Sequence, residues 1–315
     1  MTKIMNPTNQ VFLATLAVIA VGYFVKRLGY ITEQDGKSIS KLLMHTTFPA
    51  LMIVSTVRIQ FKPDLLFIPL FGLVFGSLMM LIAWFVFKKE ENDMRGLMVM
   101  SAAGLNLGLF AFPIIQDIWG QEGLSYAILL DIANTIVSFV LVYSVAQYFA
   151  AKRATYTPTE GSLKKAIFKK VFQSLPFQGM ILGLCINVLG IELPSVVLNS
   201  LDVLAKGNKP LGLLLLGIYL NFGLKKHEIK AITKLLCLRY IWGLAIVVLL
   251  YYNLPPSVLR STLIVCIILP IGLVVLPFSD ELKYDARVAG LAVNLSLVIS
   301  FILMWGLILG LGLTF

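Results

Sequence analysis

Long apolar runs separated by short polar segments repeat along the whole chain. A helix needs about 20 apolar residues to cross the hydrocarbon core of a bilayer, so this pattern predicts an all-α polytopic membrane protein. We expect ten transmembrane helices, near residues 10–28, 38–57, 64–87, 96–117, 123–149, 171–191, 208–224, 232–252, 258–279 and 286–313. The first run is not expected to be a cleaved signal, because its basic residues follow the apolar stretch instead of preceding it.

Two of these runs contain residues that disfavour a continuous helix. The fourth contains GLNLGLFAFPII at 104–115, in which glycine, asparagine and proline interrupt an apolar stretch, and the ninth contains PIGLVVLP at 270–277. Proline removes a backbone donor, and glycine weakens a helix by roughly 1 kcal/mol. We therefore predict that helices four and nine are broken, with Pro113, Pro270 and Pro277 at the breaks.

The polar segment AKRATYTPTEGSLKK at 151–165 lies between the fifth and sixth runs. It predicts a first five-helix unit at 1–150, a linker at 151–170 and a second five-helix unit at 171–315. Because five is odd, the second unit enters the membrane upside down relative to the first, as in the inverted repeats of many transporters. Weak internal similarity agrees, since Pro49 and Pro210 occupy corresponding places in the second and seventh runs.

Basic residues follow the odd-numbered runs. Most of the 26 lysines and arginines fall in these loops, and we count Arg239 among them, in the loop after the seventh run. Cytoplasmic loops are enriched in Lys and Arg, so the bias predicts a multi-pass protein of the cell membrane with both termini outside.

Composition supports the membrane assignment and excludes several classes of protein. The chain is 58% hydrophobic and 13% charged, whereas soluble domains carry about 25% charged residues. The net charge of +10 follows from the loop bias and does not predict binding to nucleic acid. Cys185, Cys237 and Cys266 show no metal-ligand spacing, and we expect no metal, cofactor or disulfide.

The broken runs carry a resemblance to a known family. Asn106, Gly108, Ala111 and Pro113 in the fourth run, LPIGLV at 269–274 and FPALM at 48–52 resemble motifs of the auxin efflux carrier family. The resemblance implies two inverted five-span repeats, helices four and nine crossing at the site, and transport of organic anions by alternating access; it also allows a homodimer. Two departures are Ala111, where members often have glycine, and ELKYDAR at 281–287 after the ninth run.

Paired interrupted helices in inverted halves point to a substrate site near the bilayer midplane. At a break, helix N-termini carry partial positive charge and favour an anion. The residues that we predict to bind substrate are Asn106, Gly108, Pro113, Asn134, Pro270, Gly272, Asn294 and Ser296. Asn294 and Ser296 could instead form hydrogen bonds between helices.

Two ionisable residues fall at membrane depth. Asp131, Asn134, Thr135 and Ser138 are spaced i, i+3, i+4, i+7 and share one helix face. A carboxylate there is unfavourable unless it faces water or a partner, so Asp131 is either a site for a coupling proton or sodium ion or a brace for a neighbouring helix. His45 has the same two interpretations, because histidine titrates near neutral pH but also packs in helices.

Together these features predict a secondary active transporter of small organic anions: carboxylates, dicarboxylates or auxin-like acids. The alternatives are a sodium-coupled bile-acid-type anion symporter and a membrane sensor without transport. An enzyme is disfavoured, since His227-Glu228 lacks the second histidine of a zinc-protease motif. A channel usually repeats its filter around a symmetry axis, which two inverted halves do not.

Overall fold

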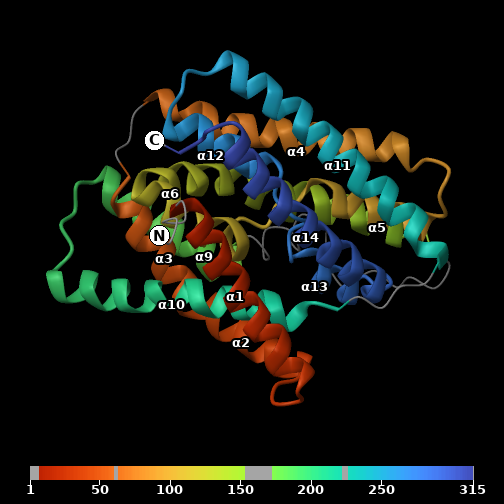
Figure 1. The fold of residues 1–315 in the computed structure, drawn as a ribbon, viewed down its shortest axis with the longest axis horizontal. Coiled ribbons are helices and arrows are strands. Elements are labelled where there is room, and N and C mark those ends of the chain that lie inside the picture. The colour runs from red at the N-terminus through yellow and green to blue at the C-terminus, as the bar shows by residue number, and fades with distance from the viewer. Residues whose placement is uncertain (1–6, 60–62, 153–171, 222–225, 315) are drawn as a thin grey trace, which may run out of the picture.

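A computed structural model describes residues 7–59, 63–152, 172–221 and 226–314, and these residues are helical apart from loops and one isolated β-bridge (Figure 1). Before the linker lie α1 (Pro7–Arg27), α2 (Glu33–His45), α3 (Thr47–Val57), the 3₁₀ turn η1 (Pro63–Leu66), α4 (Phe67–Val86), α5 (Asn92–Ala103), the π turn η2 (Leu107–Ala111), α6 (Phe112–Ile136), the π turn η3 (Val137–Val142) and α7 (Tyr143–Ala150). After it lie α9 (Leu175–Val188), α10 (Ser195–Tyr219), α11 (Lys226–Asn253), α12 (Val258–Ile267), α13 (Val275–Glu281) and α14 (Ala286–Gly310). The predicted linker at 151–170 falls outside the described residues except for its first two positions.

Five helical stretches in this part of the chain are long and apolar enough to cross a membrane: Pro7–Arg27, Phe67–Val86, Leu107–Ala150, Glu228–Asn253 and Ala286–Gly310. The prediction of an all-α membrane protein is therefore confirmed at this level. Three other predicted runs are interrupted: 38–57 between α2 and α3, 96–117 after α5, and 258–279 between α12 and α13. The seventh run, predicted to start at 208, is helical from Ser195.

Local sequence sets several of these boundaries. Thr32 and Asp35 form a capping box that starts α2, and each residue's side chain binds the other's backbone N–H. The Asp35 carboxylate accepts from the backbone N–H and then the hydroxyl of Thr32, and these two hydrogen bonds hold the pKa of Asp35 below its usual value. Gly120 has φ +60°, so the chain leaves helical geometry inside α6 between the predicted end of the fourth run at 117 and the predicted start of the fifth at 123.

The helices pack in two groups that each draw on both sides of the linker. In the first helix group, α3 packs against α9 and α10, and α1 and α2 pack against α10. In the second, α4, α5, α6 and α7 pack with α11, α12, α13 and α14. Gly22 and Gly217 bring α1 and α10 so close that a Cβ atom on either would collide with the other helix's backbone. Small residues of this kind allow close helix packing in membranes.

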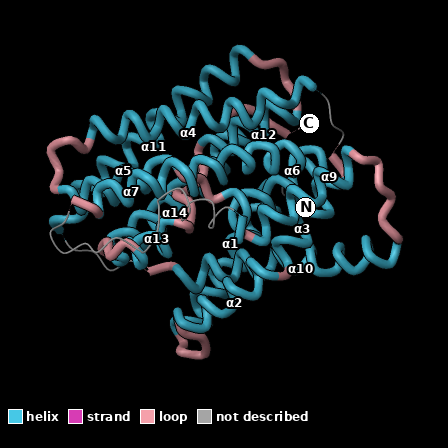
Figure 2. The backbone as a smooth tube through the Cα atoms, turned by 180° about the vertical axis from the view of Figure 1, so that it is seen from behind, coloured by secondary structure: helices cyan, strands magenta, loops and turns pink. Residues whose placement is uncertain are grey.

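The start of α1 and the end of α14 lie at one end of the bundle, beside the N and C labels of Figure 1. Trp305 donates from Nε1 to Oδ1 of Asn9 at 2.9 Å, and the ring of Trp305 stacks on Phe12. Figure 2 shows the long helices side by side, with most connections at the ends of the bundle.

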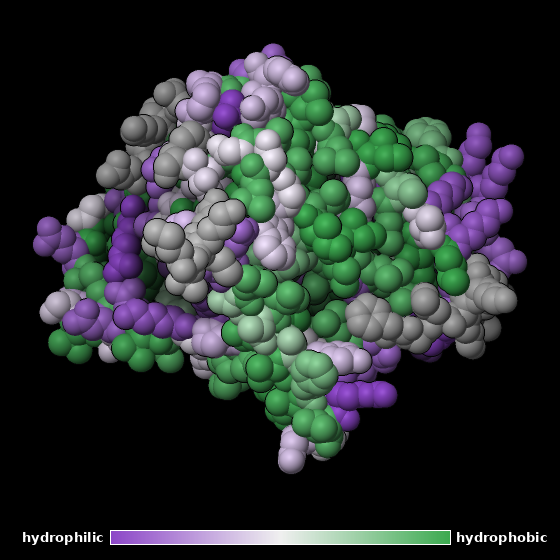
Figure 3. Space-filling model, viewed as in Figure 1, coloured by the Kyte–Doolittle hydropathy of each residue, from purple (hydrophilic) through white to green (hydrophobic). Residues whose placement is uncertain are grey.

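Hydrophobic residues cover the middle of the face in Figure 3, and most hydrophilic ones gather at its margins. Large apolar side chains are exposed on helices from both groups, among them Phe24, Leu70, Phe85, Ile241 and Ile302. An outer surface this apolar suits contact with lipid chains, since soluble proteins rarely expose such large apolar patches.

Candidate functional site

The breaks predicted in the fourth and ninth runs are present, and they touch. After α5 ends at Ala103, Gly104 is extended, and Leu105 pairs with Ile271 in an antiparallel bridge. The N–H of Asn106 donates to the carbonyl of Pro270 at 3.0 Å, and the N–H of Gly272 donates to that of Gly104 at 3.1 Å. Each break thus satisfies backbone groups of the other, which irregular backbone at membrane depth requires.

Asn134 of α6 holds the first break. Its Oδ1 accepts from the N–H of Leu105 at 2.9 Å, and its Nδ2 donates to the carbonyl of the same residue at 3.0 Å. That Nδ2 also donates to Oδ1 of Asp131, one turn earlier on α6, at 2.9 Å. Leu105 is therefore bound on one side by the other break and on the other side by a side-chain amide oriented by Asp131.

Ser296 of α14 holds the second break. Its Oγ accepts from the N–H of Ile271 at 3.0 Å and donates to the carbonyl of Val293 at 2.7 Å. Ser300, one turn later, donates to the carbonyl of Ile268 at 2.6 Å. The helix that follows each broken span therefore supplies the side chain that fixes it.

Arg239 corrects the sequence analysis, which placed it in a loop. It lies inside α11, is 5% exposed, and donates to carbonyl oxygens of both broken spans. The eighth run, predicted over 232–252, already included this residue, so the span prediction and the count of loop charges disagreed about it. A single arginine seven residues inside a predicted span was the available signal that Arg239 lies at depth.

The three prolines occupy different places. Pro270 lies in the second break, where its carbonyl accepts from Asn106. Pro113 follows the π turn η2, whose wider backbone accommodates a ring that would clash with a preceding α-helical turn. Pro277 is the third residue of α13, so it lies in a first helical turn, where a missing N–H is tolerated.

A cavity of about 640 Å³ opens beside the paired breaks, between the two helix groups. Of the predicted site residues, the following line it: Asn106, Gly108, Asp131, Asn134, Gly272 and Pro277. Gly108 also packs against the ring of Phe48, and a Cβ atom at this position would collide with that ring. The first helix group contributes mainly apolar residues to the lining, including Met44, Phe48, Met52, Phe177 and Met180.

Five predicted residues lie outside the described cavity lining: His45, Pro113, Pro270, Asn294 and Ser296. His45 is exposed at the end of α2 and bonds from Nδ1 to the carbonyl of Lys41 at 2.7 Å. Asn294 donates to the carbonyls of Tyr219 and Asn221 at the end of α10. Ser296 reaches the site only through Ile271, as described above.

The cavity has charged groups that sequence analysis did not assign to it. Lys37, Ser40, Lys41 and Met44 are spaced i, i+3, i+4, i+7, and this face of α2 lines the cavity. Asp280 at the end of α13 lines it too. Two exposed lysines thus lie on the same cavity as the polar residues of the first break.

Asn106 is the most unusual side chain in the lining. It is 5% exposed, and its Nδ2 has no hydrogen-bond partner among the described residues. A buried amide without a partner costs about 1–3 kcal/mol, so such groups are rare unless they serve a function. The next residues, Leu107, Gly108 and Leu109, begin the helix formed by η2 and α6 and also line the cavity.

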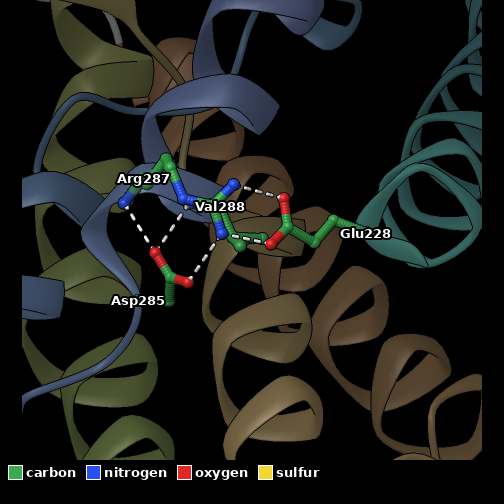
Figure 4. Close-up of polar contacts among 4 residues, drawn as sticks. All are labelled: Glu228, Asp285, Arg287 and Val288. Atoms are coloured by element: carbon green, nitrogen blue, oxygen red, sulfur yellow. Dashed lines mark hydrogen bonds and ion pairs between the residues drawn. The ribbon is translucent and has the colours of Figure 1, made fainter. Parts of the chain in front are cut away.

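Ion pairs outside the described cavity lining link neighbouring helices. In Figure 4, Arg287 reaches Glu228 of α11 and Asp285, the N-cap of α14, and so joins these two helices. Burial opposes ionisation of Asp285, but hydrogen bonds from the N–H groups of Val288 and Arg287 outweigh it and lower its pKa. Between the two helix groups, Lys209 of α10 contacts Asp117 of α6 at 2.5 Å.

An all-helical, multi-pass protein in which two interrupted spans meet beside a cavity has the architecture of a membrane transporter. Comparison with known proteins agrees: the family described as membrane transport protein matches residues 8–308. The chain belongs to this family, the auxin efflux carrier family, as its motifs predicted.

Two archaeal proteins are similar to the chain. An uncharacterized transporter of Methanothermobacter thermautotrophicus is 26% identical over 232 residues, which cover 72% of each chain. An uncharacterized transporter of Methanocaldococcus jannaschii is 26% identical over 221 residues, 67% of this chain and 68% of the relative. Family membership therefore makes this protein a membrane transporter.

Proposed function

We propose that the protein is a secondary carrier that moves small organic anions by alternating access, with the anion bound in the cavity beside the paired breaks. The observation that carries this proposal is Asn106. This residue lines the cavity at the start of the η2–α6 helix, and its buried Nδ2 has no hydrogen-bond partner among the described residues. Helix N-termini and free N–H donors together favour a carboxylate.

Asp131 and Asp280 line the cavity on the side of the breaks, and the lysines on the facing side, from α2, support an anionic substrate. Lys37 and Lys41 line the cavity from α2, and long-range attraction by exposed lysines raises the local concentration of anions. The apolar side chains of the first helix group would contact the hydrocarbon part of the same molecule. A small carboxylate or dicarboxylate, or an auxin-like acid, fits this arrangement of polar and apolar lining.

The inverted repeat remains part of the proposal, and the contacts at the breaks support it. An antiparallel bridge has local two-fold symmetry, and Leu105 and Ile271 are its partners. Asn134 binds the N–H of one, and Ser296 binds the N–H of the other, each from the span that follows. Two five-helix units of opposite orientation would produce this correspondence.

We infer that this conformation is open to the cytoplasm. The cavity reaches Lys37 and Asp280, which flank loops that the positive-inside rule places in the cytoplasm. Lys209 and Asp117 join the two helix groups nearer the opposite end. The proposed orientation in the cell membrane therefore has both termini outside and the closed side facing out.

Asp131 is the proposed coupling residue. Asp131 lines the cavity, and its carboxylate accepts from the Asn134 amide that binds Leu105. A change in the charge of Asp131 would therefore alter the hydrogen bonds at the first break. His45, the other candidate, bonds its own helix outside the described lining. We propose that a proton is the coupling ion; a sodium ion is the alternative, as in a bile-acid-type symporter.

Purified protein in proteoliposomes tests the function. Uptake of labelled malate, malonate, indole-acetate and a bile-acid-like anion is measured with imposed proton or sodium gradients. We expect saturable uptake and countertransport of at least one anion, driven by the proton gradient. Uptake that never saturates would indicate a channel, and no uptake of any anion would contradict the anion proposal.

Two variants locate the site. Asn106→Ala should lower transport about tenfold or more through a raised KM, because it removes the free amide. Asn253→Ala is the matched control, since Asn253 is exposed and bonds only its own helix.

Asp131→Asn should weaken the response of transport to the proton gradient. An unchanged response to both the proton and the sodium gradient would leave Asp131 with a structural role only.

A further inference from the structure

Arg239 contacts the ends of two half-helices at once. Its Nη1 donates to the carbonyls of Ser101 and Gly104, each at 3.2 Å, and to that of Ala102 between them, all at the end of α5. Its Nη2 donates to the carbonyl of Leu269 at 2.9 Å, just after α12. The two nitrogens of one guanidinium therefore bind different broken spans.

In the described part of the chain, no carboxylate forms an ion pair with Arg239. The positive charge of Arg239 is instead balanced by the partial negative charges of two helix C-termini. A helix C-terminus carries roughly −0.5 elementary charge, and α5 and α12 both end here, so together they present about −1. One buried arginine matches the combined charge, which explains how it is tolerated at this depth.

We propose that Arg239 is a positioning residue of the transport site, which neutralises the two converging helix C-termini and so keeps the two breaks paired. This inference rests on the proposed function, because the breaks are where the anion is proposed to bind. Arg239 is outside the described cavity lining, so it acts through the backbone of residues 101–104 and 269 and not on the anion.

Without a cation, the two helix ends would repel each other at the point where Leu105 and Ile271 pair. Their carbonyls would also lose hydrogen-bond donors in a place that water does not reach freely. Lysine cannot replace arginine fully, because its single ammonium nitrogen cannot reach both helix ends as the two Nη nitrogens of the planar guanidinium group do. The geometry thus selects arginine specifically.

A substrate-free measurement of break pairing provides the test. The hydrogen bonds flank Leu105 and Ile271, which makes them a non-hydrogen-bonded antiparallel pair. Such a pair has Cα atoms about 4.5 Å apart, within the range of about 4.4–6.8 Å for a disulfide. Leu105→Cys with Ile271→Cys, in a background in which Cys185, Cys237 and Cys266 are replaced by alanine, should cross-link under mild oxidation.

In this background Arg239→Gln should slow cross-linking about tenfold or more, and Arg239→Lys should slow it less, because small displacements of paired backbone have large effects on reaction geometry. Arg260→Gln is the matched control. Arg260 is also buried, at 8% exposed, and also binds carbonyls at a helix end, those of Tyr251 and Leu254 at the end of α11. The Arg260→Gln variant should cross-link at the parental rate.

Transport is the second measurement, in the native-cysteine protein. Arg239→Gln should raise KM and lower the maximal rate together, whereas Arg260→Gln should keep the parental KM. If Arg239→Gln does not fold, Arg239→Lys carries the test, with slower cross-linking again expected. Parental cross-linking in the folded Arg239 variants would overturn the proposal. Cross-linking needs no substrate, so the cross-linking rates of the Arg239 variants can be interpreted even if no transported anion is found.

Discussion

The two breaks meet at one point, but different chemistry holds them. Asn134 binds both backbone groups of Leu105, whereas Ser296 binds only the N–H of Ile271. Asn134 and Asn106 line the cavity, and Ser296 lies outside the described lining. The first break thus combines structural and cavity-lining polar groups, while the second contributes mainly backbone.

If the two halves form the proposed inverted repeat, this difference means that corresponding positions need not share a role. In the proposed carrier, both breaks keep the cavity shaped, but one set of polar side chains is enough to recognise the proposed substrate, a small anion. We therefore expect substitutions at the first break to disturb transport more than their counterparts at the second.

The largest effect is expected for Asn134→Leu. It leaves the N–H and carbonyl of Leu105 without their side-chain partner, and each unsatisfied buried group costs about 1–3 kcal/mol. Transport should fall roughly a hundredfold, with a lower thermal midpoint in detergent. Asn253→Leu, on the exposed part of α11, serves as control. Near-normal transport by Asn134→Leu would remove the first break from the mechanism.

Ser296→Ala should have a smaller effect. It leaves one N–H unpaired, that of Ile271, so we expect about a tenfold loss of transport. Ser279→Ala removes a hydroxyl that is equally buried but bonds only its own helix, and it should transport normally. A loss from Ser296→Ala as large as that from Asn134→Leu would show that the two breaks are equivalent after all.

The prolines offer a third comparison. Pro113→Ala removes the ring that favours the π turn η2, and a return to α-helix would rotate Asn106 relative to the cavity. We expect roughly a fivefold rise in KM. Pro194→Ala, at the N-cap of α10 and outside the described cavity lining, should change KM less than about twofold. Measuring KM for both variants decides whether the π turn positions the first break.

The smallest expected effect on transport comes from substitutions of the two glycines that flank the bridge, Gly104 and Gly272. A Cβ atom at Gly272 would lie 3.3 Å from the carbonyl oxygen of Leu105, which is tight, whereas the nearest atom at Gly104 would be 3.5 Å away. Gly272→Ala should therefore lower transport about threefold, and Gly104→Ala should leave it nearly unchanged. Initial uptake rates at equal protein density test this, and the reverse order would contradict the geometry of the bridge.

Much of the fold was readable from local patterns. The apolar runs predicted a helical membrane protein, and the motifs around Asn106 and Pro270 predicted the family, which the comparison confirmed. The interruptions at 104–106 and 268–274 were also expected, since glycine, asparagine and proline weaken a helix wherever they occur. Prolines were poorer markers of the break itself, because only Pro270 lies in one.

The cavity lining and the place of Arg239 depended instead on contacts between segments far apart in the sequence. The cavity takes Lys37 and Lys41 from α2, and Tyr219 from the end of α10, and nothing in those segments marked them as lining residues. Arg239 was assigned to a loop because its charge resembles that of its basic neighbours. Its proposed role follows only from its hydrogen bonds to carbonyls of two distant segments, residues 101–104, more than 130 positions away, and Leu269, 30 positions away.

The sequence by itself determined that this chain is helical, membrane-embedded and interrupted in two spans, because apolar run length and backbone propensity act over a few neighbouring residues. Only the tertiary structure decided that the interruptions pair with each other, which side chains satisfy them, and where the cavity lies. Those outcomes depend on hydrogen bonds between residues far apart in the chain, whose free backbone groups have no local partner and must find one across the fold.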